Sequence, residues 1–337
     1  MINLCFSVGK EIIQKLKASI VLVCVDEAHV SLPSQWGHDG MREDMYMAPS
    51  YLKAQVVSTT KAPVLAMTAS AKSVASSKRE KTEIDEIKNM CSIQYSPTTT
   101  IVISPILHNH LYVKLKKPPV TYGFYGKNCY SFSPTQIGSV HVLYRIYLKN
   151  FIADIKNNRN PKRAILFVKQ TQDLADIEEF LSAQLKDVAI TRNPNTCPWV
   201  CNSSSTGPIT TQKIRERTQE NESPIYLYIT TSVMLFGLNI KNVSIVIMFS
   251  PFNSLNSFLQ AGGRAGRRQG DGKRKKSVVY LLYNGTDVRK NSPMEGSVRA
   301  FCEDNTCLKQ KIHSLFSLSS SVLPSNNWCC SVCNLDD

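Results

Sequence analysis

Short, continuous apolar runs separated by polar or helical stretches are the main pattern along the chain. In its first third these runs cover residues 19–25, 64–67 and 101–103, and many of their residues are β-branched. A strand that is buried on both faces of a parallel sheet has this composition, whereas a half-exposed strand alternates apolar and polar residues. Three such strands joined by helices predict part of an α/β lobe.

The pattern is interrupted over residues 116–160, which are less regular and contain Pro118 and Pro119, as a linker would. It then restarts, with buried strands predicted at 164–168, 225–229, 243–249 and 277–282, a short strand at 187–190, and helices at 173–185 and near 211–218. The rest of 192–224 is polar and is predicted to be loop. This succession predicts a second α/β lobe.

We therefore expect an α/β chain with four segments. They are an incomplete first lobe at 1–115, a linker with the start of the second lobe at 116–160, the second lobe at 161–290, and a small carboxyl-terminal segment at 291–337.

The charge balance changes this picture by pointing to a partner. The chain has 40 Lys and Arg against 26 Asp and Glu, a net charge of +14. Such an excess favours a polyanion, either nucleic acid or, less often, an acidic membrane surface, and the alternative is a merely soluble basic protein. Because no run of about 18 apolar residues occurs, we expect no membrane span. The first residues also lack the basic and long apolar regions of a signal peptide.

The first apolar run leads directly into Asp26, Glu27, Ala28 and His29. Ligands bind at the carboxyl ends of strands in parallel sheets, and acidic residues there suit a magnesium–triphosphate site. Asp26 would hold the metal through water, and Glu27 would orient or deprotonate the attacking water. The alternative is an exposed acidic pair that caps the following helix.

A second candidate site is the segment 260–267, which fits the pattern Q-x-x-G-R-x-G-R through Gln260, Gly263, Arg264, Gly266 and Arg267. Guanidinium groups bind phosphate in a bidentate manner and stabilise charge that develops during phosphoryl transfer. Glycines let the backbone approach a phosphate closely. The alternative is a basic, glycine-rich surface loop.

Together these segments resemble superfamily 2 helicases. Residues 26–29 resemble motif II and residues 260–267 motif VI, while residues 67–70 resemble motif III and residues 231–240 motif V. The resemblance implies two RecA-like lobes that use ATP and Mg²⁺, with Arg264 and Arg267 sensing the γ-phosphate. It further implies nucleotide contacts from one set of residues, namely His29, Gln260, Gly263, Gly237 and Asn239, and nucleic-acid contacts from Thr68 and Thr231.

The branch that the chain resembles is RecQ-like, because residues 34–39 (Ser-Gln-Trp-Gly-His-Asp) match the start of that family's aromatic-rich loop. In such a loop Trp36 would stack on a base of single-stranded DNA, and His38 would link this contact to the nucleotide site. The alternative is a core Trp36 and an ordinary polar His38. The resemblance implies a 3′-to-5′ DNA helicase in recombination and repair, nuclear, acting on single strands and on duplexes with a 3′ overhang. An RNA helicase of the same superfamily is the nearest alternative.

The cysteines near the carboxyl end support the same branch. Of 11 cysteines, five lie at 302–333, and RecQ-like proteins carry a helical zinc-binding subdomain after the second lobe. Thiolates at short spacing suit tetrahedral zinc. We expect Cys307, Cys330 and Cys333 as ligands with Cys329 as the fourth, and Cys302 and His313 as rivals for that place. Reduced, unliganded thiols are the alternative. Cys197 and Cys201 form a second, weaker pair.

The sequence also departs from the family. It contains no G-x-x-x-x-G-K-[ST] phosphate loop, since Lys10 is followed by Glu11, and we expect that the chain begins inside the first lobe and is inactive on ATP by itself. Asn239 replaces the usual motif V aspartate, and Cys201 and Asn202 lie about where a Tyr-His pair is expected. A nucleic-acid-binding helicase remnant without ATP turnover is therefore the alternative function, and a nucleotide-independent adaptor that binds RNA or a membrane is a third.

Overall fold

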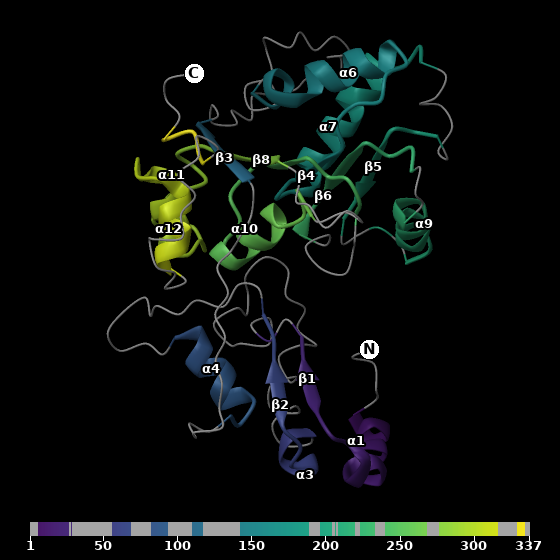
Figure 1. Cartoon of the computed structure of the whole chain (residues 1–337). Coiled ribbons are helices and arrows are strands. Elements are labelled where there is room, and N and C mark those ends of the chain that lie inside the picture. Colours follow the sequence, from purple (N-terminus) through teal and green to yellow (C-terminus); the bar gives the residue numbers. More distant parts are fainter. Residues whose placement is uncertain are drawn as a thin grey trace. The chain divides into compact units, whose positions relative to one another are not determined.

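Figure 1 shows the computed structural model of the chain. It describes residues 6–26, 28, 56–68, 82–93, 110–116, 142–188, 196–203, 206, 208–219, 223–232, 240–267, 276–315 and 329–333. The chain divides into two compact units. Unit 1 comprises residues 1–106 and 310–324, and unit 2 comprises residues 107–309 and 325–337.

Unit 1 contains a pair of parallel strands. Its elements are α1 (Phe6–Leu16), η1 (Lys17–Ser19), β1 (Val23–Val25), α3 (Ser58–Thr60), β2 (Val64–Ala66) and α4 (Glu83–Met90). β1 pairs with β2 in parallel, with Val23 opposite Val64. A small core forms where Ile87, Met90 and Cys91 meet Val25 and Val64. Two of the apolar runs of the sequence thus become neighbouring parallel strands.

The described strands of unit 2 form a six-stranded sheet in the order β3-β8-β7-β4-β6-β5. Every pairing in it is parallel. This arrangement confirms the predicted α/β class with parallel sheets. The strands are β3 (His110–Lys116), β4 (Ala164–Phe167), β5 (Trp199–Asn202), β6 (Leu227–Thr230), β7 (Ile245–Met248) and β8 (Ser277–Tyr283).

Helices follow most of these strands. They are η6 (Tyr144–Leu148), α6 (Lys149–Lys156), α7 (Thr171–Gln184), α9 (Pro208–Gln219), α10 (Leu255–Gly262) and α11 (Gly296–Glu303), and α12 (Leu308–Leu315) crosses the division between the units. Among the described helices, none combines the length and apolar character that crossing a bilayer requires.

The sheet of unit 2 is covered on both faces, with α6 and α7 on one side and α10 on the other (Figure 1). On the first side Phe151 and Phe180 pack with Leu166 and Ile229 in one large core. On the second side Phe258 of α10 lies against Tyr112 of β3, with 6.1 Å between ring centroids. All four residues of the central strand β4 are buried. A strand enclosed in this way needs apolar side chains on both faces, which explains the continuous apolar run at 164–168.

The range 116–160, predicted as a linker with the start of the second lobe, includes helical structure from Tyr144 to Lys156 whose apolar side chains enter the core of unit 2. Two other parts of unit 2 differ from the sequence prediction. Trp199–Asn202, predicted as loop, is strand β5, and Asp187 lies in a turn. The strand His110–Lys116, which the sequence grouped with the first lobe, pairs with β8 in the second sheet. These segments depend on partners distant in sequence, which periodicity does not reveal.

Candidate functional site

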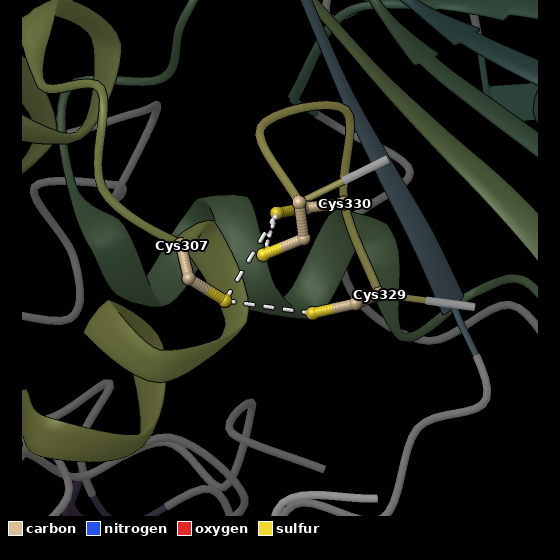
Figure 2. A group of neighbouring side chains, drawn as sticks. Cys307, Cys329 and Cys330 are labelled. Atoms are coloured by element: carbon tan, nitrogen blue, oxygen red, sulfur yellow. Dashed lines mark hydrogen bonds between the residues drawn. The ribbon is translucent and has the colours of Figure 1, made fainter. Parts of the chain in front are cut away.

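Four cysteines of unit 2 come together near the carboxyl end of the chain. The Sγ atoms of Cys307, Cys329, Cys330 and Cys333 all lie within 4.8 Å of one another. The Sγ–Sγ distances are 3.4 Å for Cys307 and Cys329, 4.0 Å for Cys307 and Cys330, and 3.6 Å for Cys330 and Cys333. Figure 2 shows the first three side chains turned toward a common point.

These separations suit a tetrahedral metal ion. Four sulfur atoms bound at about 2.3 Å around zinc lie about 3.8 Å apart, and the observed distances fall on either side of that value. Cys302 and His313, the rivals for the fourth place, lie outside the group of four. The structure thus brings together the four residues that the sequence favoured, and this group could hold a metal.

The environment of the cluster already favours a thiolate. The hydrogen bond from Cys329, together with backbone N–H groups of Leu308, Cys333 and Val332, lowers the pKa of Cys330 to about 4. The pKa of Cys329 is raised, because its proton is held by the neighbouring Cys330 and Cys307. Burial raises the pKa of Cys333 to about 12. A zinc ion that replaced these protons would bind all four sulfur atoms, because zinc binds cysteine in its thiolate form.

Cys197 and Cys201 behave differently. Both pack against the large core of unit 2, Cys201 from strand β5. Burial raises the pKa of both thiols, so both favour the neutral form. Neither belongs to a group of three or more potential ligands in the described part of the chain.

In unit 1 the structure brings together the ends of the segments that resemble motifs II and III. Asp26 follows β1 directly and is exposed, and Thr68 lies two residues after β2. Backbone hydrogen bonds join these ends, from Met67 N to Val25 O at 2.8 Å and from Ala28 N to Met67 O at 2.9 Å. Both therefore occupy the carboxyl edge of the strand pair, where parallel sheets bind ligands. Glu27, His29, Trp36 and His38 lie outside the described residues.

In unit 2 the segment 260–267 forms the end of α10 and the turn that follows. Ser254 caps the start of α10 by accepting a hydrogen bond from Ser257 N at 3.1 Å. After the helix, Gly266 adopts a left-handed conformation, with φ 59°, and its N–H donates to Val243 O at 3.0 Å. A glycine takes this conformation at no steric cost, so Gly266 fixes the turn against the residues that lead into β7.

The candidate nucleotide contacts differ in exposure along this segment. Gln260, Gly263 and Arg264 are half-buried, whereas Arg267 is exposed and its Nε donates to Gly263 O at 3.1 Å. The helix end and the turn thus hold both arginines within one short, hydrogen-bonded loop.

The candidate nucleic-acid contact Thr231 follows β6 and is buried, and its N–H donates to Asn202 O at the end of β5, at 3.2 Å. It therefore lies at the carboxyl edge of the six-stranded sheet. Gly237 and Asn239 lie outside the described residues.

The sequence did not identify the residues that hold the cysteine cluster. On β3, Tyr112 and Lys114 form hydrogen bonds with the turn that carries Cys329 and Cys330. No local motif marks these two residues, because their partners lie more than 200 positions away in the chain. Only the alternation of HLYVKLK could have suggested a strand there.

Comparisons with known proteins agree with this architecture. Residues 142–269 match the helicase conserved C-terminal domain. The search of curated proteins finds no match. The chain resembles the solved structure of the Mycobacterium smegmatis helicase Lhr bound to ssDNA and AMP-PNP, with 16% identity and a TM-score of 0.54, over 91% of this chain and 33% of that one. It also resembles the helicase MrfA bound to DNA and AMPPNP, with 16% identity and a TM-score of 0.51, over 81% and 32%.

The chain thus spans about a third of the length of these two helicases. At this identity the likeness concerns the fold. The matched residues run from the helical segment before β4, through β4, β5, β6 and β7, to the turn that holds Arg264 and Arg267. Residues 142–269 of the second unit are therefore similar to the helicase conserved C-terminal domain.

Proposed function

We propose that this chain is part of a RecQ-type, ATP-dependent DNA helicase that moves 3′ to 5′. The observation that carries the proposal is the position of Gln260–Arg267 at the end of α10, inside a domain that matches the helicase conserved C-terminal family. Two solved structures that share this fold are helicases bound to DNA. The RecQ branch and the polarity rest on the resemblance of residues 34–39 and of the cysteine tail to that family.

In this proposal the two arginines contact the nucleotide phosphates. Arg267 is exposed, and the hydrogen bond from its Nε to Gly263 O orients the guanidinium group. Bidentate donors of this kind stabilise negative charge on a transferring phosphoryl group. Gln260 adds a further nucleotide contact. Asp26 holds Mg²⁺ through water at the end of β1, and Glu27 activates the attacking water.

In this proposal nucleic acid contacts residues that follow the carboxyl ends of strands. These residues are Thr68 after β2 and Thr231 after β6. The net charge of +14 favours such a polyanion. Trp36 contributes a base-stacking contact, as the aromatic loop of the family implies.

The four cysteines hold zinc in the proposed enzyme. When bound, zinc cross-links the segment before α12 to the turn at Cys329–Cys333 and supplies no catalytic chemistry. The sulfur separations support this assignment.

Nucleic-acid-stimulated ATP hydrolysis tests the function. We would measure phosphate release by the chain with and without single-stranded DNA, and with a matching RNA strand. Glu27→Gln removes the proposed base at nearly constant shape, and Arg267→Lys keeps the charge but loses the bidentate fork. DNA-stimulated hydrolysis that both variants reduce by about 100-fold or more supports an ATP-driven DNA helicase. Stimulation by RNA alone overturns the DNA assignment.

A second candidate is a nucleic-acid-binding protein of helicase fold that does not turn over ATP. One observation favours it, because the printed sequence contains no G-x-x-x-x-G-K-[ST] loop to grip the β and γ phosphates. Hydrolysis that depends on Glu27 excludes this candidate. Saturable DNA binding without any ATP hydrolysis is the result that we expect of the chain by itself, and it agrees with this candidate. Absence of both binding and hydrolysis excludes the two candidates together.

A further inference from the structure

β3 is the end strand of the six-stranded sheet, and the cysteine turn covers its outer edge. An end strand presents a row of unpaired N–H and C=O groups, which natural proteins usually cover. Here Tyr112 N donates to Cys329 O at 3.2 Å, and Ser331 N donates to Tyr112 O at 2.8 Å. Lys114 N donates to Ser331 Oγ at 3.1 Å. The turn thus occupies the place of a further strand, and a parallel bridge joins Tyr112 to Cys330.

The same strand also contacts the segment that leads to Cys307. The Lys114 ammonium donates a hydrogen bond to Asp304 O, near the end of α11. The side chain of Asp304 accepts a hydrogen bond from Thr306 N at 3.0 Å, which orders the residues immediately before Cys307. Lys114 is therefore in contact with both segments that carry the sulfur atoms, although Cys307 and Cys329 are 22 residues apart. Figure 2 shows the strand passing beside the turn and the cluster.

From these contacts we infer that β3 is the template on which the metal site assembles, with Lys114 as a positioning residue, and that metal binding in turn locks the edge of the sheet. The inference rests on the metal assignment in the proposed function. Free energies of binding and of edge closure are linked and reciprocal. A contact that helps to close the edge must therefore raise metal affinity, and bound metal must protect the edge.

Substitution of Lys114 tests the positioning role. Lys114→Met keeps most of the aliphatic side chain and removes the ammonium, and Lys116→Met is the matched control because Lys116 is exposed at the end of the same strand. A hydrogen bond from a charged group is usually worth enough for a tenfold effect, so we expect zinc affinity to fall by about tenfold or more in Lys114→Met. Lys116→Met should change it by no more than about twofold. Lys114→Arg keeps a charged donor and should recover most of the affinity.

Zinc content, measured first on the unsubstituted chain, tests the metal assignment separately from the positioning role of Lys114. If purified chain reconstituted with zinc binds none, the metal assignment fails. If it binds one zinc per chain, but Lys114→Met and Lys116→Met show equal affinities in competition with a chromophoric chelator, the positioning role is overturned and the metal assignment stands.

Hydrogen exchange tests the lock without any substitution. The amides of Tyr112 and Lys114 point to the cysteine turn, and the alternation of a strand directs those of Leu111 and Val113 toward β8. On removal of zinc by a chelator we expect exchange at Tyr112 and Lys114 to accelerate by about tenfold or more, while Leu111 and Val113 remain protected. Unchanged exchange at all four amides, or equal acceleration at all four, would overturn the lock.

Discussion

Tyr228 on β6 is a tyrosine in the buried core of the second unit. The residue is 0% exposed and lies opposite Ile165 of β4 and Val200 of β5. Its hydroxyl oxygen has no hydrogen-bond partner among the described residues. Burying a hydroxyl without a partner costs about 1–3 kcal/mol by mutational data. Tyr228→Phe removes only this oxygen, so we expect it to stabilise the fold by about 1 kcal/mol, up to the full desolvation cost.

Tyr147→Phe is the matched control in the same unit. Tyr147 is 4% exposed and stacks on Phe151 at 5.7 Å, but its hydroxyl donates to Lys162 O at 2.8 Å. Loss of that bond should destabilise the fold by about 0.5–1.5 kcal/mol. Urea unfolding of both variants and of the parent chain gives the differences from the midpoints and a common slope. The reasoning is refuted if Tyr228→Phe lowers the free energy of unfolding as much as Tyr147→Phe does.

Three further predictions concern single contacts. Ser254→Ala removes the cap of α10 and should lower the free energy of unfolding by about 1 kcal/mol in urea, and no change would mean that the cap bond is unimportant. Gly266→Ala places a side chain at φ 59° and should lower the free energy of unfolding by about 1 kcal/mol in the same assay. No change would mean that the turn relaxes and that the 3.0 Å hydrogen bond to Val243 O is dispensable. Burial raises the pKa of the Cys91 thiol from 9.0 to about 11, so the unfolded chain ionises first and stability should fall as pH rises between these values. Cys91→Ala should flatten that fall, and an unchanged pH profile would contradict the assignment.

The central strands of the second unit were predictable from the sequence for a physical reason. β4, β6, β7 and β8 lie inside a parallel sheet, so most of their side chains are apolar on both faces and appear as continuous runs. The end strands β3 and β5 lack this signal. Apart from a short alternation of apolar and polar residues, β3 is identified by its pairing with β8, which joins residues 167 positions apart, as between His110 and Ser277.

The cysteine cluster, too, was predictable from the sequence only in part. Spacing favoured Cys330 and Cys333, and the resemblance added Cys307. The choice of Cys329 over Cys302 depends on the turn that β3 binds, and no spacing in the sequence encodes that turn. Of the other candidate residues, Arg264 and Arg267 lie together in one loop, while Glu27 and Trp36 fall outside the described residues and stay predictions.

Titration of a fluorescently labelled single-stranded DNA with the purified chain, followed by anisotropy, tests most directly whether this fold serves nucleic acid. We expect saturable binding at low salt that weakens by about tenfold or more as salt rises from 50 to 200 mM, because lysines and arginines displace counterions from the phosphates. A chain that folds, as judged by a cooperative urea transition, yet shows no saturable binding at low salt would contradict the account.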